Sequence, residues 1–340
     1  MKPSDHTSPD SGRAAATSDR TAPRVPKLAI VAPCYNEQDM LPISAPRLVA
    51  LMDSLIADGL ITSDSFLLFV NDGSRDATWS IISRLHEENP MCHGLDLSRN
   101  VGHQNAIMAG MLSAVEAPEM ADAVITIDVD LQDPLECIPE MLDAYYNGYD
   151  VVYGVRSSRE SDSFMKRYTA ESFYKFQATM GVKTIFNHAD FRFMTRRVVL
   201  ELEKYGERNL YLRGIIPMIG FPSTTVEEVR AEREAGTTKY TLRKMLRLAF
   251  DGITSFSVTP IYCIMALGGI FVLIAIAIGI YVLISLLNGS AVHGWSSLIL
   301  SVWFVGGTIL IAVGLVGLYV GKVYIETKHR PRYHIQSHLH

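Results

Sequence analysis

The chain has 340 residues, of which 48% are hydrophobic and 20% are charged, and its formal net charge is -5. This composition excludes a disordered chain, a fibrous protein and a basic nucleic-acid-binding protein, so no nucleic acid is expected as a partner. None of the charged residues falls within residues 252–321. Because a water-soluble domain cannot present an uncharged stretch of that length, a purely soluble protein is excluded as well.

The first 26 residues are expected to form a disordered tail. Residues 1–21 are rich in Ser, Thr, Ala and Asp and lack the apolar core of a secretory signal peptide. The four cysteines form no C-x-x-C pair, and no Cys/His spacing in the chain suits zinc. The large domain that follows the tail is therefore expected in the cytosol.

Between residues 27 and 239, short continuous apolar runs alternate with stretches of helical periodicity. Such apolar runs are typical of strands that are covered on both faces, and the helical stretches have the length of right-handed crossovers. The alternation predicts an α/β domain with a mostly parallel sheet. The expected strands are 28–32, 66–70, 123–127 and 150–153, and the expected helices are 48–56, 78–88, 105–115 and 136–146.

Residues 258–323 are expected to form an anchor of two transmembrane helices. The uncharged stretch is interrupted near Asn288, and both halves, 260–287 and 295–320, exceed the ~20 residues that cross a hydrocarbon core of ~30 Å. Basic residues flank the outer ends and are missing from the connecting loop. This charge distribution predicts a multi-pass protein of the cytoplasmic (inner) membrane, with the large domain and both termini in the cytosol.

Two further segments border this anchor. Residues 240–257 are basic at first and then apolar, which fits either an amphipathic helix on the membrane surface or a plain linker helix. Residues 324–340 are expected to be a cytoplasmic tail.

Three of the expected strands end in polar or acidic sequences, at 33–37, 71–76 and 128–134. Ligands of open α/β sheets bind beyond the carboxyl ends of the strands, so these residues are the candidates for function. Asp128 and Asp130 are two residues apart, and an extended backbone would aim both carboxylates to one side. Such oxygen ligands suit Mg²⁺ or Mn²⁺ shared with substrate phosphates.

Two common classes of nucleotide-binding protein are excluded by missing motifs. No G-x-G-x-x-G follows the first strand, and no G-x-x-x-x-G-K-[ST] occurs anywhere in the chain. A Rossmann oxidoreductase and a P-loop NTPase are therefore not expected.

Six motifs occur in order, followed by the two expected membrane helices. They are APCYNE at 32–37, NDGS at 71–74, LSRNVGHQ at 97–104, DVDLQDP at 128–134, DFR at 190–192 and R-x-x-G-x-x-K-Y at 233–240. This set resembles the polyprenyl-phosphate glycosyltransferases of glycosyltransferase family 2. Within that family it is most similar to the bactoprenol (undecaprenyl phosphate) glucosyltransferase branch, which is related to dolichyl-phosphate mannose synthases.

The resemblance implies a glycosyltransferase-A-type fold over residues 27–239 and a role for each matched residue. Pro33, Tyr35, Glu37 and Asp72 would cradle the nucleotide, and Asp128, Asp130 and Gln132 would hold the Mg²⁺ or Mn²⁺ that bridges the diphosphate. Asp190 matches the presumed catalytic acid, with Arg192 beside it for the acceptor phosphate or the donor. Arg233 and Lys239 would close over the diphosphate of the nucleotide-sugar, and Arg156 is a candidate for the lipid phosphate.

Two of these assignments have alternatives. Asp190 can deprotonate the acceptor, orient it, or form a purely structural salt bridge to Arg192 or Arg196. His103 and Gln104 either reach the nucleotide-sugar or cap the helix that begins nearby.

The implied activity is the inverting transfer of one sugar, with glucose from UDP-glucose favoured, to polyprenyl phosphate on the cytosolic leaflet for cell-envelope glycan modification. The Q-x-x-R-W motif of processive synthases is absent. Rival donors are GDP-mannose, UDP-N-acetylglucosamine, UDP-galactose and a formylated aminoarabinose nucleotide. The rival class is a catalytically silent membrane protein that binds a nucleotide-sugar. A homo-oligomer, with a tetramer as one form, is also expected.

Overall fold

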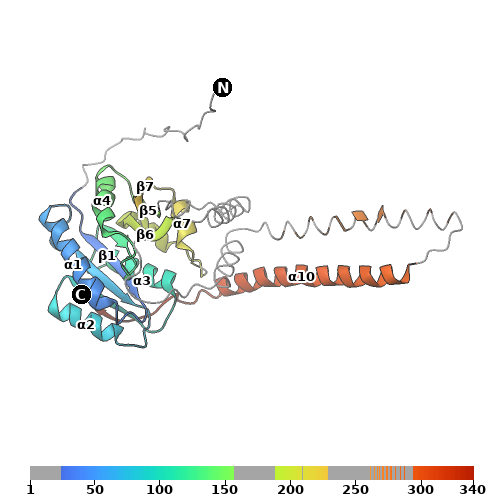
Figure 1. Ribbon diagram of the computed structural model, residues 1–340, viewed down its shortest axis with the longest axis horizontal. Helices are drawn as coiled ribbons and strands as arrows, with labels where there is room; N and C mark the ends of the chain where they lie inside the picture. The colour runs from blue at the N-terminus through green and yellow to red at the C-terminus, as the bar shows by residue number, and fades with distance from the viewer. Residues whose placement is uncertain are drawn as a thin grey trace, which may run out of the picture.

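The computed structural model describes residues 24–156, 188–208, 210–228 and 294–340, together with isolated positions between 261 and 287. These residues form an α/β domain from which one long helix projects (Figure 1). The expected tail (1–26) as far as residue 23 lies outside the described residues. So do the whole of the expected juxtamembrane helix (240–257) and most of the expected first membrane helix (260–287).

The described elements alternate between strands and helices in the first half of the chain, as expected. They are β1 (Leu28–Cys34), α1 (Leu41–Ala57), β2 (Phe66–Asn71), α2 (Thr78–Glu88), β3 (Cys92–Leu97), α3 (His103–Val115), β4 (Ala123–Thr126), the 3-10 helix η1 (Leu135–Cys137), α4 (Ile138–Tyr146), β5 (Val151–Arg156), β6 (His188–Thr195), α6 (Arg196–Glu203), α7 (Leu212–Ile219), β7 (Ser223–Glu228), α10 (Trp295–Thr327) and β8 (Ile335–Leu339).

The strands form one eight-stranded sheet in the order β7-β5-β6-β4-β1-β2-β3-β8. β1 pairs in parallel with β2 and β4, β2 with β3, and β5 with β7. β6 runs antiparallel to both of its neighbours, and β8 runs antiparallel to β3. The α/β class with a mostly parallel, mixed sheet is thus confirmed. The antiparallel course of β6 brings its first residues to the edge where β4 ends.

Helices cover both faces of this sheet. In β1, Ala29 and Val31 pack into the hydrophobic cluster that contains residues of α3, α6 and α7, whereas Leu28, Ile30 and Ala32 pack into the cluster with α1, α2 and α4. Side chains alternate between the two faces of a strand, so a continuous apolar run is the pattern that burial on both faces requires.

The end of the chain differs from the tail expected at 324–340. α10 continues to Thr327, and β8 then pairs with β3, with Gly94 opposite Leu339. The backbone N–H of Ser98 also donates to the carbonyl of His334 at 3.0 Å. This segment is part of the domain because β3 would otherwise leave its backbone groups without a neighbouring strand.

α10 contains the one helix segment of the described residues that is long and apolar enough to cross a membrane. This segment is Phe304–Thr327, which has a mean hydropathy of 2.1. Its most apolar part is not buried against the rest of the described protein. The ring of Phe271, from the first expected membrane helix, lies edge-on to Phe304 at 5.2 Å between centroids.

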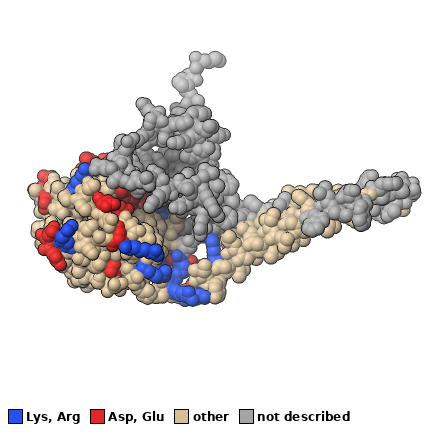
Figure 2. Space-filling model, turned by 60° about the horizontal axis from the view of Figure 1, so that its bottom comes forward, with Lys and Arg blue, Asp and Glu red and all other residues tan. Residues whose placement is uncertain are grey.

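The base of α10 is fastened to the domain by polar contacts. Glu326 accepts a hydrogen bond from the backbone N–H of Arg208 at 2.8 Å, and the guanidinium of Arg332 donates to the carbonyl of Tyr205. Lys and Arg side chains gather where the helix meets the domain (Figure 2).

Candidate active site

The loops that follow β1 and β2 are fastened to each other. The backbone N–H of Asn36 donates to Ser74 Oγ at 3.0 Å, and its side-chain oxygen accepts from the N–H of Arg75 at 2.9 Å. Asn36 takes a positive φ of 55°, which this residue type tolerates. The next residue, Glu37, donates its N–H to Thr78 at 2.9 Å. Tyr35 is left exposed beside the half-buried Pro33 at the carboxyl edge of the sheet.

Asp72 is buried and shapes the loop that precedes α3. Its carboxylate accepts from the N–H groups of Val101 at 2.7 Å and Gly102 at 3.1 Å, and from the amide of Asn100 at 3.0 Å. Burial raises the pKa of Asp72, and these N–H donors oppose the rise. Asp72 therefore organises loop 100–102, while its expected contact with a nucleotide stays a prediction.

His103 lies between two carboxylates from different strands. Its Nε2 is 3.7 Å from Asp128 Oδ1, just beyond β4, and 3.5 Å from Asp190 Oδ2 on β6. Burial lowers the pKa of His103, but Asp190 and Asp128 together raise it above its usual value. Gln104 also reaches Asp190 Oδ2, at 3.4 Å, and accepts from the N–H of Leu212. Both side chains thus point into the site.

Asp190 is the centre of a charged cluster. Its Oδ1 accepts from Arg192 at 2.5 Å, and Arg213 donates to Oδ1 at 3.2 Å and to Oδ2 at 3.0 Å. Burial alone would raise the pKa of Asp190, but His103, Arg192 and Arg213 hold it well below its usual range. The carboxylate is therefore ionised at neutral pH and is a weak proton acceptor. This geometry favours an orienting role over a general base.

The two arginines of the cluster differ in their access to a ligand. The Arg192 side chain is 1% exposed, so it pairs with Asp190 from the protein interior and does not reach the surface where an acceptor phosphate would lie. The Arg213 side chain is 32% exposed, so it contacts Asp190 from the solvent-accessible side of the cluster. Sequence reasoning missed Arg213, because it stands in an apolar segment with no motif around it, and only its contact with Asp190 marks it.

The expected metal ligands form a tight acidic turn after β4. Asp130 is buried and accepts from the N–H of Gln132 at 3.2 Å, and Asp133 accepts from the N–H of Asp128 at 3.3 Å. Leu131 takes a positive φ of 53° within this turn. The Asp128 side chain is 34% exposed and faces His103. Neighbouring carboxylate oxygens at a strand end fit a hard divalent cation, with the partly exposed Asp128 as the most accessible ligand.

Three further residues of the expected site lie at or beyond the limits of the described residues. Arg233 and Lys239 lie outside the described residues. Arg156 ends β5, in register with Glu228 of β7. The structure therefore brings together Asp128, Asp190 and Arg192 from the expected set and adds His103, Gln104 and Arg213.

Comparison with known proteins places the chain in a family. Residues 29–202 match the family described as Glycosyl transferase family 2. The chain is 47% identical to the glycosyltransferase YkoT of Bacillus subtilis over 93% of both chains. It is 39% identical to the bactoprenol glucosyl transferase of Shigella phage SfV, over 92% of this chain and 98% of the relative.

A solved structure shows a more distant likeness. The mannosyltransferase PcManGT from Pyrobaculum calidifontis, in complex with GDP-Man and Mn²⁺, matches with a TM-score of 0.42 and 16% identity over 66% of this chain and 62% of that chain. The family match and the two close relatives are sufficient for the assignment: this chain belongs to glycosyl transferase family 2.

Proposed function

We propose that this chain is an inverting glycosyltransferase that moves one glucose from UDP-glucose to a polyprenyl phosphate at the cytosolic face of the cytoplasmic membrane. The lipid-linked glucose would then serve the modification of cell-envelope glycans. The observation that carries the proposal is the 39% identity to a bactoprenol glucosyl transferase, because the match extends over 92% of this chain and includes both the α/β domain and α10.

We extend the proposal to a glycosyltransferase-A-type domain with Mg²⁺ or Mn²⁺ as cofactor. Asp128, with Asp130 and Gln132 in the same turn, would hold the ion. When bound, the ion supplies positive charge that stabilises the departing nucleoside diphosphate. Support comes from the exposed Asp128 carboxylate at the carboxyl end of β4, where an open α/β sheet binds its ligands.

The protein's own charges account for the rest of the chemistry. A lipid monophosphate is already an anion, since its second pKa is about 6, so the acceptor needs little help from a base. The low pKa of Asp190 agrees with such a reaction. Asp190 fixes Arg213 and His103, and Arg213 presents a positive charge to the anionic substrates. Direct attack of the phosphate oxygen on the anomeric carbon inverts the configuration.

The membrane anchor suits the acceptor. A polyprenyl chain outside the bilayer would expose apolar surface at roughly 25 cal/mol per Å², so the enzyme must work at the membrane surface. The exposed apolar segment Phe304–Thr327 supplies one span. The multi-pass anchor stays a proposal, which the ring contact between Phe271 and Phe304 supports. A homo-oligomer stays a prediction that crosslinking in membranes would test.

The deciding experiment is a transfer assay with purified full-length protein, undecaprenyl phosphate, Mg²⁺ or Mn²⁺, and a panel of labelled UDP- and GDP-sugars. We expect label in the lipid extract from UDP-glucose alone, and its loss with EDTA and in Asp128→Ala. The matched control is Asp143→Asn, which removes an exposed carboxylate from α4 and should keep full activity. Label from another donor would overturn the glucose assignment. Nucleotide-sugar binding without transfer from any donor would overturn catalysis.

A further inference from the structure

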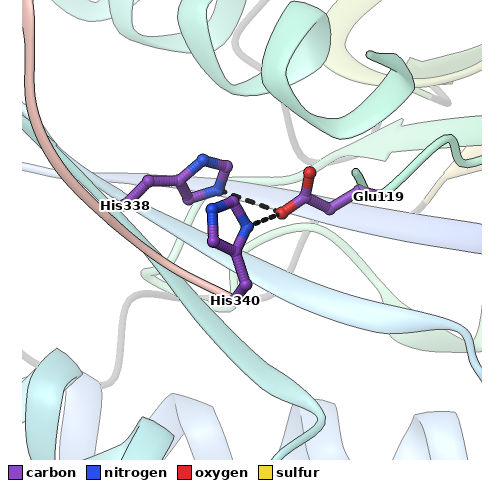
Figure 3. A group of neighbouring side chains, drawn as sticks. All are labelled: Glu119, His338 and His340. Atoms are coloured by element: carbon purple, nitrogen blue, oxygen red, sulfur yellow. Dashed lines mark hydrogen bonds and ion pairs between the residues drawn. The ribbon is translucent and has the colours of Figure 1, made fainter. Parts of the chain in front are cut away.

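A second group of side chains meets near the amino ends of the parallel strands, whereas Asp128 follows the carboxyl end of β4. Figure 3 shows its three members, Glu119, His338 and His340. Glu119 belongs to the loop between α3 and β4, His338 lies on β8, and His340 follows that strand directly. One nitrogen or oxygen atom from each residue lies within 4.8 Å of the others. Residues more than 200 positions apart in the sequence are thus gathered at the amino ends of the parallel strands.

One pair of donor atoms in this group has the spacing of two ligands on a shared cation, because His338 Nε2 is 3.3 Å from Glu119 Oε1. His340 Nδ1 is hydrogen-bonded to the same oxygen. Two ligands bound tetrahedrally to one zinc ion at about 2.0–2.1 Å lie about 3.3 Å from each other. On β3, His93 brings a further imidazole nitrogen to 3.8 Å from Glu119 Oε1.

The hydrogen bonding of the group is incomplete. Among the described residues, His338 Nε2, His93 Nδ1 and Glu119 Oε2 are buried and have no hydrogen-bond partner. The first two lie at ion-pair distance from Glu119 Oε1 but lack hydrogen-bond geometry. Nitrogen and oxygen atoms that lie close together without hydrogen-bond geometry are arranged as the ligands of one metal ion would be.

Among the described residues, the Glu119 carboxylate also has no ion pair with Lys or Arg. The Glu119 side chain is 2% exposed, and within the described part of the chain it forms ion pairs with histidines only. Burying a carboxylate without a strong cation is costly, and a buried polar group without a partner adds to that cost. A divalent cation would supply the missing charge and the missing contacts together.

We propose that Glu119, His338 and His340 form a zinc site, beside the imidazole of His93 on β3. Imidazole nitrogens with one carboxylate favour zinc over Mg²⁺ or Ca²⁺, which prefer oxygen ligands. The site is far from the strand ends that carry Asp128 and Asp190, so its role is structural. It ties the strand that follows the membrane helix to β3 and to the α3–β4 loop.

Metal content of the full-length protein tests this proposal independently of sugar transfer. The protein is purified through an N-terminal tag free of histidine, stripped with a chelator, reloaded with ZnCl₂ and freed of excess zinc. We expect about one zinc per chain. Co²⁺ in place of zinc should give the strong visible absorption of a tetrahedral site.

Variants locate the ion. Glu119→Gln and the double change His338→Ala/His340→Ala should lose the bound metal, whereas His334→Ala, from the same segment but outside the group, should retain it. Zinc should raise the unfolding temperature of the wild type by about 5–10 °C and leave that of the double variant unchanged. Equal zinc contents in the wild type and the double variant would overturn the proposal. If the variants do not fold, a wild-type Co²⁺ spectrum without tetrahedral bands would overturn it as well.

Discussion

Replacing Asp190 by Asn tests whether the charged cluster is a buried ion pair that organises the site. The change keeps the shape of the side chain and removes its negative charge. In the structure the Asp190 side chain is 13% exposed and its partner Arg192 only 1%, so the guanidinium would be left buried without its carboxylate. Breaking a buried pair in this way costs about 3–5 kcal/mol. Arg213 and His103 are more exposed and can rehydrate, so they should add little.

The pH dependence gives a second signature of the same pair. The folded pKa of Asp190 lies well below 3.8, so its ionised form stabilises the fold above that pH. This contribution is lost as the pH falls below 3.8 toward the folded pKa. Asp190→Asn has no carboxylate to protonate. Its stability should therefore fall less steeply than that of the wild type over this acidic range.

Pulse proteolysis in urea measures the free energy of unfolding of the domain in the full-length protein. Transfer of glucose to the lipid is measured on the same preparations, and a loss of roughly 10²–10³ in kcat is expected, since a preorganised charge is removed. The control is Asp150→Asn. Asp150 is also buried, but it pairs with the half-exposed Arg197 at the amino edge of the sheet, so stability should fall less and transfer should persist.

The reasoning is refuted if Asp190→Asn loses less than about 1 kcal/mol, because the pair would then behave like an exposed salt bridge. If Asp190→Asn loses the expected 3–5 kcal/mol but transfers glucose at the wild-type rate, the buried ion pair is supported and only the orienting role of Asp190 is contradicted.

Three further predictions concern the loop before α3 and its neighbours. In urea unfolding, Gly73→Ala should destabilise the protein by at least about 2 kcal/mol, because φ is +59° and a Cβ would lie 2.3 Å from the backbone nitrogen of Asn100. The control Gly59→Ala, where φ is +68° and the space is open, should cost only about 1 kcal/mol. The pKa of His103 in the folded protein lies above 6.5, so the stabilisation by its charge is complete below pH 6.5 and is lost as the pH rises through that folded pKa. His103→Gln should therefore flatten this part of the plot of unfolding free energy against pH. An unchanged plot would contradict the contact of His103 with Asp190 and Asp128. Arg213→Lys should lower the rate of glucose transfer about tenfold or more while the fold is retained, because Lys cannot donate two parallel hydrogen bonds to one carboxylate. Full activity of this variant would show that the paired hydrogen bonds from Arg213 to Asp190 are dispensable.

The elements that the sequence predicts are those buried on both faces by apolar residues. β1, β2 and β4 and the four crossover helices follow from uninterrupted apolar runs and helical periodicity. β3 and β6 do not, because His93, Asp96, Asp190 and Arg192 stand inside them. Charged side chains are accommodated in these strands only through partners from other elements, such as Asn71 for Asp96 at 2.6 Å. Such partners cannot be read from a local pattern.

The same limit applies to the site. The acidic turn after β4 and the importance of Asp190 follow from motifs, since short sequences at strand ends carry them. Arg213 and the group around Glu119 depend on long-range packing, and no local spacing announces them. The buried position of Arg192 also follows from tertiary structure, because the sequence does not show which side of β6 faces the core.

The position of β8 has a consequence for the order of biosynthesis. Ribosomes deliver the chain from the N-terminus, so β3 emerges long before the strand that pairs with it, and α10 is made between the two. The outer edge of β3 therefore stays open during translation until α10 and then β8 have been synthesised. The sheet can therefore be completed only after α10 has been synthesised, and a chain truncated within α10 leaves an unfinished edge that chaperones and proteases can recognise.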